Sequence, residues 1–207
     1  METSSYESRK SKDRVEPRFN RREIMDAVKM FLEAVGRSTE EEGLAGTPDR
    51  VARMVEEILE GEHYSNSDIA EMFKTCFKTD STDLVVETKI PIFSYCEHHL
   101  ALMYNMYASV GYIPNGKVIG LSKMARIVDM VSKRLQLQER IGNDSAEILQ
   151  KVLGTEDVMV VIEGEHSCMT ARGIKSRGAK TRTASLHGAF KTNAQLRSEF
   201  YSLIEKE

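Results

Sequence analysis

Two short sequence segments, about seventy residues apart, hold most of the metal-binding side chains, so the fold must bring them together if they bind one ion. Cys96-Glu97-His98-His99 and His166-Ser167-Cys168 contain two of the three cysteines and three of the five histidines. Thiolates and imidazoles are the ligands that zinc prefers, and three ligands with an open position are typical of a catalytic site. A closed structural zinc site, or reduced buried cysteines with surface histidines, are the alternatives.

Spacing within each segment predicts which side chains face one another. An extended run, residues 90–95, leads into Cys96, and a C-x2-H spacing would let Cys96 and His99 bind one metal ion, with His98 turned toward a substrate. His166 and Cys168 are two residues apart, so we expect them on one face of a strand. Cys76 lies among apolar residues and is expected in the core.

Composition excludes several classes of protein. The 207 residues suit one domain with an N-terminal appendage. A net charge of −3 gives no general attraction to nucleic acid or to a membrane. The chain has no apolar run of membrane-spanning length, and its first residues lack the apolar core of a signal peptide. Three cysteines are too few for a disulfide framework, so we expect a cytoplasmic, reducing setting.

Hydrophobic periodicity predicts an α+β fold with antiparallel strand pairs. Residues 1–20 are polar and are expected to form a flexible tail. Apolar spacing predicts helices from residue 21 to Gly36 and from Thr47-Pro48 to Gly61, with a short one at 68–73. Beyond these we expect strands at 84–90, 102–113, 158–163 and 181–190, and helices capped by Ser122, over 139–153, and capped by Asn193. Because strands come in pairs rather than alternating with helices, a parallel sheet is not indicated.

Two basic segments could bind phosphate. Ser122, Lys123 and Arg126 lie at a predicted helix start, where backbone N–H groups and the helix dipole favour anions. Residues 172–180 form a basic loop that contains glycine and begins with Arg172, four positions after Cys168. The alternatives are a capped surface helix and a solvated turn.

Gln138 and Glu139 join two predicted helices and could read a guanine base. A carboxylate there could accept hydrogen bonds from the guanine N1–H and the exocyclic amine. Because glutamate is also common in the first turn of any helix, an ordinary helix start is the alternative interpretation.

Five segments together resemble the GTP cyclohydrolase I family, the zinc enzymes at the start of pterin and folate synthesis. The matching segments are GTPDRVARM at 46–54, SYCEHHL at 94–100, GYIPNGKVIGLSKMARIVDM at 111–130, RLQLQER at 134–140 and EGEHSCMTARG at 163–173. The resemblance covers roughly residues 22–204, and the order and spacing of five segments make it specific.

The resemblance implies a tunnelling fold, in which two helices pack on one face of a four-stranded antiparallel sheet. It implies a single catalytic domain at 21–207, with N-terminal helices over about 21–75 and the core over about 82–207. It also implies a toroidal homodecamer with active sites at subunit interfaces. The implied reaction converts GTP and water to formate and 7,8-dihydroneopterin triphosphate, with one Zn²⁺ in each subunit.

The resemblance also implies a role for individual residues. The implied zinc ligands are Cys96, His99 and Cys168, and the implied catalytic groups are His98, His166 and Ser122. The implied guanine contacts are Gln138 and Glu139. The implied triphosphate contacts are Ser122, Lys123, Arg126, Arg172 and, from a neighbouring subunit, Arg50. Arg53 stands where many members have lysine, and is a further phosphate candidate.

One departure and two rival functions follow from the same comparison. The segment between His99 and Tyr112 is one residue longer than in the family, so a continuous strand there requires a bulge.

One rival function is that of a zinc-stabilised nucleotide-binding protein without turnover, which would not need the histidine pair. The other is a sister enzyme of the tunnelling fold, the nitrile reductase of deazaguanine synthesis, which uses a cysteine nucleophile and no zinc. The pairing of Cys96 and Cys168 with His99 favours metal.

Overall fold

The structure, a computed structural model, describes residues 19–205. The polar tail predicted at 1–20 therefore lies outside the described residues, apart from Phe19 and Asn20. The chain divides into two compact units, one ending at Glu56 and the other beginning at Glu57. No helix of the described part is long and apolar enough to cross a membrane.

The first unit contains two amphipathic helices. Helix α1 (Arg21–Ala34) begins where the Asn20 side chain accepts a hydrogen bond from the backbone N–H of Glu23. Helix α2 (Thr47–Ile58) ends two residues into the second unit. An apolar groove between the two helices is lined by Ile24, Ala27, Val28, Phe31, Leu32, Thr47, Val51 and Val55. The two apolar stripes predicted from the sequence therefore face this common groove.

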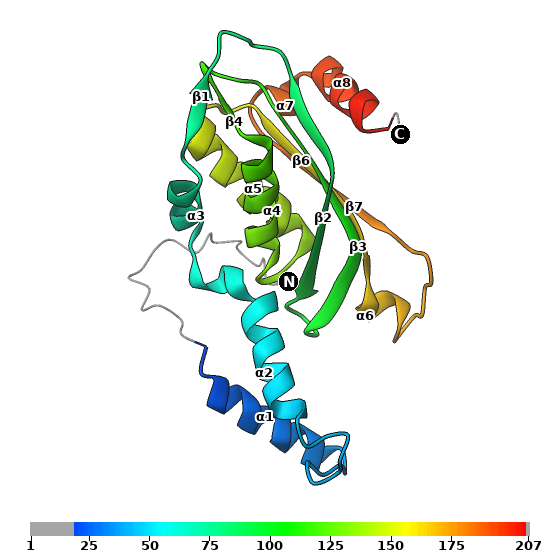
Figure 1. Ribbon diagram of the computed structural model, residues 1–207. Helices are drawn as coiled ribbons and strands as arrows, with labels where there is room; N and C mark the ends of the chain where they lie inside the picture. Colours follow the sequence, from blue (N-terminus) through cyan, green and yellow to red (C-terminus); the bar gives the residue numbers. More distant parts are fainter. Residues whose placement is uncertain (1–18, 206–207) are drawn as a thin grey trace, which may run out of the picture. The chain divides into compact units, whose positions relative to one another are not determined.

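The second unit is built on a sheet with the strand order β5-β2-β3-β6-β7. Its long strands β2 (Val85–Cys96), β3 (Ala101–Tyr112), β6 (Val158–His166) and β7 (Thr181–Leu186) are antiparallel neighbours. The short strand β5 (Leu135–Gln136) pairs in parallel with the end of β2. A separate pair, β1 (Cys76–Lys78) and β4 (Lys117–Ile119), lies at the other end of β2 (Figure 1).

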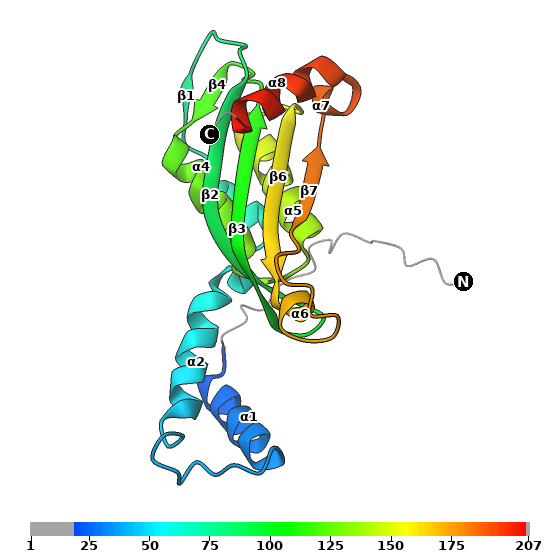
Figure 2. The ribbon, with the colours of Figure 1, turned by 90° about the vertical axis from the view of Figure 1, so that its right-hand side faces the viewer.

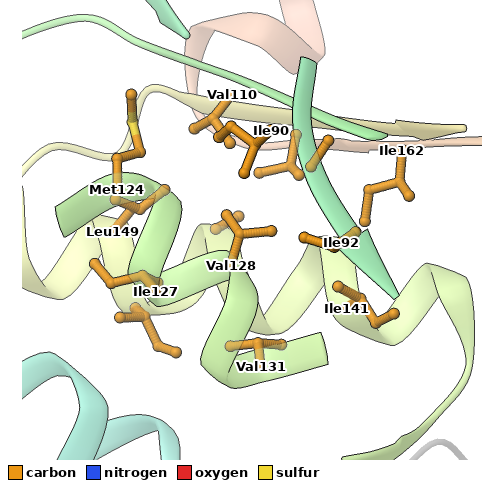
Figure 3. Close-up of a cluster of buried hydrophobic side chains, with 14 of the residues drawn as sticks. Ile90, Ile92, Val110, Met124, Ile127, Val128, Val131, Ile141, Leu149 and Ile162 are labelled. Atoms are coloured by element: carbon orange, nitrogen blue, oxygen red, sulfur yellow. The ribbon is translucent and has the colours of Figure 1, made fainter. Parts of the chain in front are cut away.

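Two helices cover one face of the sheet and form the main core. Helix α4 (Leu121–Ser132) lies beside α5 (Gln138–Leu153) (Figures 1 and 2), with α3 (Asn66–Met72) packed against both. The apolar residues of α4 recur at intervals of three and four, so one stripe of the helix faces the sheet. Figure 3 shows this stripe, Met124, Ile127, Val128 and Val131, among buried side chains of β2, β3, α5 and β6.

The opposite face of the sheet is covered by the C-terminal helices α7 (Ala189–Thr192) and α8 (Ala194–Ile204) (Figure 2). Phe190 and Phe200 are fully buried there, with ring centroids 6.2 Å apart. A side chain at Gly111 would meet the Phe200 ring at 2.6 Å, so β3 has a glycine beneath α8.

Most predicted elements are confirmed, and the α+β class with antiparallel pairs is correct. Ser122 does not cap α4, because the chain is extended at Gly120 and the helix begins at Leu121. The prediction that His166 and Cys168 share a strand face is wrong, because β6 ends at His166 and Cys168 lies in the short helix α6 (Ser167–Thr170).

The bulge required in β3 is present at Asn105. Tyr104 and Tyr107 are three residues apart on β3, but their partners on β6, Glu165 and Glu163, are two apart. Asn105 takes a φ of 48°, and its side-chain amide donates to Glu165 at 2.9 Å. The strand therefore stays continuous across the extra residue.

Candidate active site

The sheet register brings the two cysteine–histidine segments to one end of the sheet. Cys96 ends β2 and pairs with Ala101, while Met103 on β3 pairs with Ser94 on one side and His166 on the other. Paired residues point to the same face, and neighbouring strands lie about 4.8 Å apart. Ser94 and His166 are therefore about two strand spacings apart, and Cys96 lies two residues further along β2 on the same face, the one that α4 and α5 cover.

The start of α5 reaches the same end of the sheet. Gln136 of β5 pairs with Cys96, and the backbone N–H of Glu97 donates to the Gln136 carbonyl at 3.1 Å. Leu137 is the N-cap of α5, so residues 138–140 form its first turn. The guanine candidates Gln138 and Glu139 thus begin beside the predicted metal segment.

A two-pronged ion pair joins these elements. The guanidinium of Arg140 donates to both carboxylate oxygens of Glu97, at 2.7 and 3.0 Å. Glu97 is the first residue of the turn that continues with His98 and His99, whose rings are nearly perpendicular and 6.5 Å apart between centroids. The two histidine rings therefore do not stack on each other.

Gln138 and His166 are hydrogen bonded to each other. Gln138 is 1% exposed, and its Oε1 lies 2.8 Å from His166 Nε2. The Gln138 amide nitrogen donates to the backbone carbonyls of Ile162 and Thr181, both at 3.0 Å. Burial lowers the pKa of His166, and the nearby carboxylate of Glu139 opposes that shift. The lowered pKa favours the neutral form of the His166 ring.

The residues present fit a zinc ion in their chemistry. Cys96 and Cys168 are free thiols, one buried and one half-buried, while His99 is exposed. Helix α6 is joined to β3 by a hydrogen bond between Tyr104 Oη and Thr170 Oγ1, 2.9 Å long, which keeps Cys168 near this end (Figure 2). Within residues 19–205 no three side chains of His, Cys, Asp or Glu already stand in metal-binding geometry. The donor set of two thiols and an imidazole suits zinc.

The phosphate candidates of α4 lie at the other end of the sheet. Ser122, Lys123 and Arg126 occupy the first turns of α4, and Lys123 donates to the Thr75 carbonyl at 2.9 Å. The C-terminal end of α4 leads into β5 beside Cys96. Twelve helical residues span about 18 Å, so Ser122 and Lys123 lie most of a helix length from the end of α4 that leads to β5, and Arg126 about half that length.

The remaining phosphate candidates lie on other elements. Arg172 is exposed in the loop between α6 and β7. Arg50 and Arg53 lie on α2 in the first unit, where Arg50 donates to Thr47 Oγ1 at 2.9 Å and Arg53 pairs with Asp49 at 2.7 Å. The second unit by itself thus unites the metal and purine candidates, and the α4 cations stand apart from them.

Comparison with known proteins gives the family. The family model described as GTP cyclohydrolase I matches residues 24–205. The chain belongs to the GTP cyclohydrolase I family. It is 55% identical over 189 residues to GTP cyclohydrolase 1 of Clostridium botulinum (strain Loch Maree / Type A3), covering 88% of this chain and 96% of that protein. It is 52% identical over 192 residues to GTP cyclohydrolase 1 of Ruminiclostridium cellulolyticum, covering 90% and 98%.

Sequence reasoning missed two residues of this candidate site, Glu97 and Arg140. Both stand within segments that carry the family resemblance, beside residues that were singled out. An acidic residue next to a predicted ligand, and a basic one in the first helical turn against the helix dipole, were the available signals. Neither signal reveals that Arg140 forms an ion pair with Glu97, 43 residues earlier in the sequence.

Proposed function

We propose that this protein is a zinc-dependent GTP cyclohydrolase I, which converts GTP and water to formate and 7,8-dihydroneopterin triphosphate in the first step of tetrahydrofolate and pterin synthesis. The observation that carries the proposal is the register that sets Cys96 and His166 on either side of β3 beside the first turn of α5. The names of the relatives identify GTP as the substrate of those proteins.

The metal would be held by Cys96, His99 and Cys168. Two thiolates and one imidazole leave a fourth position for water. When bound, zinc supplies a nucleophile by lowering the pKa of that water, for attack on C8 of the guanine. The pairing of Arg140 with Glu97 supports this assignment, because it fixes the loop that carries His99.

Purine binding and proton transfer fall to the residues beside the metal. Glu139 is exposed in the first turn of α5 and would accept from the guanine N1–H and exocyclic amine. His166 would accept the proton that the attacking water loses and pass it to N7, which is general base and then general acid work suited to an imidazole. His98, and Ser122 from a neighbouring subunit, would serve the later steps, in which the ribose opens, rearranges and closes into the pterin.

The triphosphate would be bound between subunits. Within one chain, Ser122 and Lys123 lie in the first turn of α4, at the end of that helix away from β5 and Cys96, and Arg126 lies one turn further along. A homo-oligomer in which one subunit's α4 cations face another's zinc segment would complete the site, with Arg172, Arg50 and Arg53 as further contacts. We propose the toroidal decamer for this assembly, and the tunnelling fold for its sheet with two helices on one face.

The test is formate release from GTP by the purified, zinc-loaded protein. The proposal expects one formate for each fluorescent pterin formed after oxidation, and no formate from ATP, whose base lacks the N1–H and the exocyclic amine at the guanine position. GTP binding without formate would identify a binding protein instead. Activity that survives complete removal of zinc would exclude the metal mechanism.

A further inference from the structure

The orientation of the buried Gln138 amide is fixed by its neighbours. Its nitrogen lies 3.0 Å from the carbonyl oxygens of Ile162 and Thr181, and 3.3 Å from Thr183 Oγ1. Backbone carbonyls only accept hydrogen bonds. Turning the amide over would set its oxygen against two carbonyl oxygens in a buried place, so the nitrogen must face β6 and β7.

The other end of the amide then determines where His166 carries its proton. Gln138 Oε1 lies 2.8 Å from His166 Nε2, and this oxygen can only accept. A lone pair on Nε2 would face a lone pair on Oε1 at hydrogen-bond distance. The hydrogen bond therefore requires a proton on Nε2.

We propose that Gln138 is a positioning residue that holds neutral His166 as the Nε2–H tautomer, so that Nδ1 is the nitrogen that exchanges a proton with the substrate. This inference rests on the proposed role of His166 in proton transfer. It also assigns Gln138 a role other than a guanine contact through its side chain, because both of its amide hydrogens are directed at Ile162 and Thr181.

The assignment divides the two neighbouring residues of α5 into separate roles. Gln138 is buried and faces the sheet, whereas Glu139, one position on, is exposed. Adjacent residues of a helix point about 100° apart, so they do not read the same base edge. Glu139 would bind the purine, and Gln138 would orient the histidine.

The experiment is solid-state NMR of the zinc-loaded, assembled protein with isotope-labelled histidine, at about pH 8, where histidine is neutral. The carbon and nitrogen shifts of the ring distinguish the two tautomers, and a His166→Asn sample identifies the signals of His166. We expect His166 as Nε2–H, with the Nδ1–H form below about a tenth. An Nδ1–H ring, or comparable amounts of both forms, overturns the proposal. The NMR measurement of the tautomer does not depend on catalytic turnover.

Two variants test the cause. Gln138→Met removes the acceptor, so a measurable Nδ1–H form should appear, and kcat should fall by about tenfold or more while KM for GTP changes by less than about twofold. Thr183→Val is the matched control, because it removes the weakest of the three amide contacts and leaves both carbonyls; its spectrum should equal that of the wild type. A Gln138→Met protein with an unchanged His166 spectrum, or with a raised KM and normal kcat, contradicts the positioning role.

Discussion

Arg140 holds Glu97 through both carboxylate oxygens, and this pair joins the first turn of α5 to the turn that follows β2. Each side chain is 31% exposed, so the pair contributes little to global stability, about 1 kcal/mol or less. Its importance is local. It fixes the turn that carries His98 and His99 relative to Gln138 and Glu139.

Replacing Arg140 should therefore weaken zinc binding more than folding. Arg140→Lys keeps the charge but loses the two-pronged geometry, and we expect about a tenfold weaker zinc affinity, measured by competition with a chelator. Lys151→Ala is the control, since it removes an exposed ion pair with Glu147 further along the same helix. Equal zinc affinities in the two variants would show that the ion pair between Arg140 and Glu97 does not support the turn that carries His99.

The purine contact predicts a different phenotype for Glu139→Gln. The variant loses the negative charge that would accept from two guanine donors, so kcat/KM for GTP should fall on the order of a hundredfold. Zinc content should stay at one per subunit, measured by elemental analysis. Loss of zinc in this variant would place Glu139 among the metal ligands instead.

An interface site predicts complementation between two inactive variants. Arg50→Ala and His166→Ala should each be nearly inactive, because each lacks one part of every site. After subunits are mixed and exchanged, some interfaces would pair an intact Arg50 with an intact His166, and a fraction of the wild-type rate should return. The absence of any recovery, once mass spectrometry has verified exchange, would argue against a shared site.

A tightly packed glycine supports the turn between α4 and β5. The Gly61 N–H donates to the Lys133 carbonyl at 2.9 Å, and Arg134 Nε donates to the Gly61 carbonyl at 3.1 Å. A Cβ at Gly61 would lie 2.0 Å from the Met130 carbonyl oxygen. Gly61→Ala should lower the free energy of unfolding by at least about 1–3 kcal/mol, measured by urea titration. Gly43→Ala, where a Cβ meets nothing within 4 Å, is the control and should change stability much less.

Periodic elements were predictable from sequence because one stripe of side chains must face the core. The α4 residues Ile127, Val128 and Val131 are buried, and the α5 helix is closed by Gly154 in the left-handed region, where the pattern placed them. Element ends were less predictable. Ser122 has the chemistry of an N-cap, but extended backbone at Gly120 starts the helix two residues earlier than a Ser122 cap would.

The sequence pointed to candidate site residues but could not show their geometry. Segment spacing could not show that β6 stops at His166, and so Cys168 was expected on a strand rather than in α6. Nor can sequence distinguish a buried amide from an exposed one. Gln138 and Glu139 look equally suited to a base edge, yet only the tertiary contacts with Ile162 and Thr181 show that the Gln138 amide is already engaged.

The central claim, one zinc site built from two distant segments, is tested most directly by zinc content in three serine variants. The account predicts that Cys96→Ser and Cys168→Ser lose stoichiometric zinc and formate release together, because a three-ligand site has no spare donor. Cys76→Ser, in which the third cysteine changes near the Val152 carbonyl, should keep both. Full zinc occupancy with normal turnover in Cys96→Ser or Cys168→Ser would contradict the account.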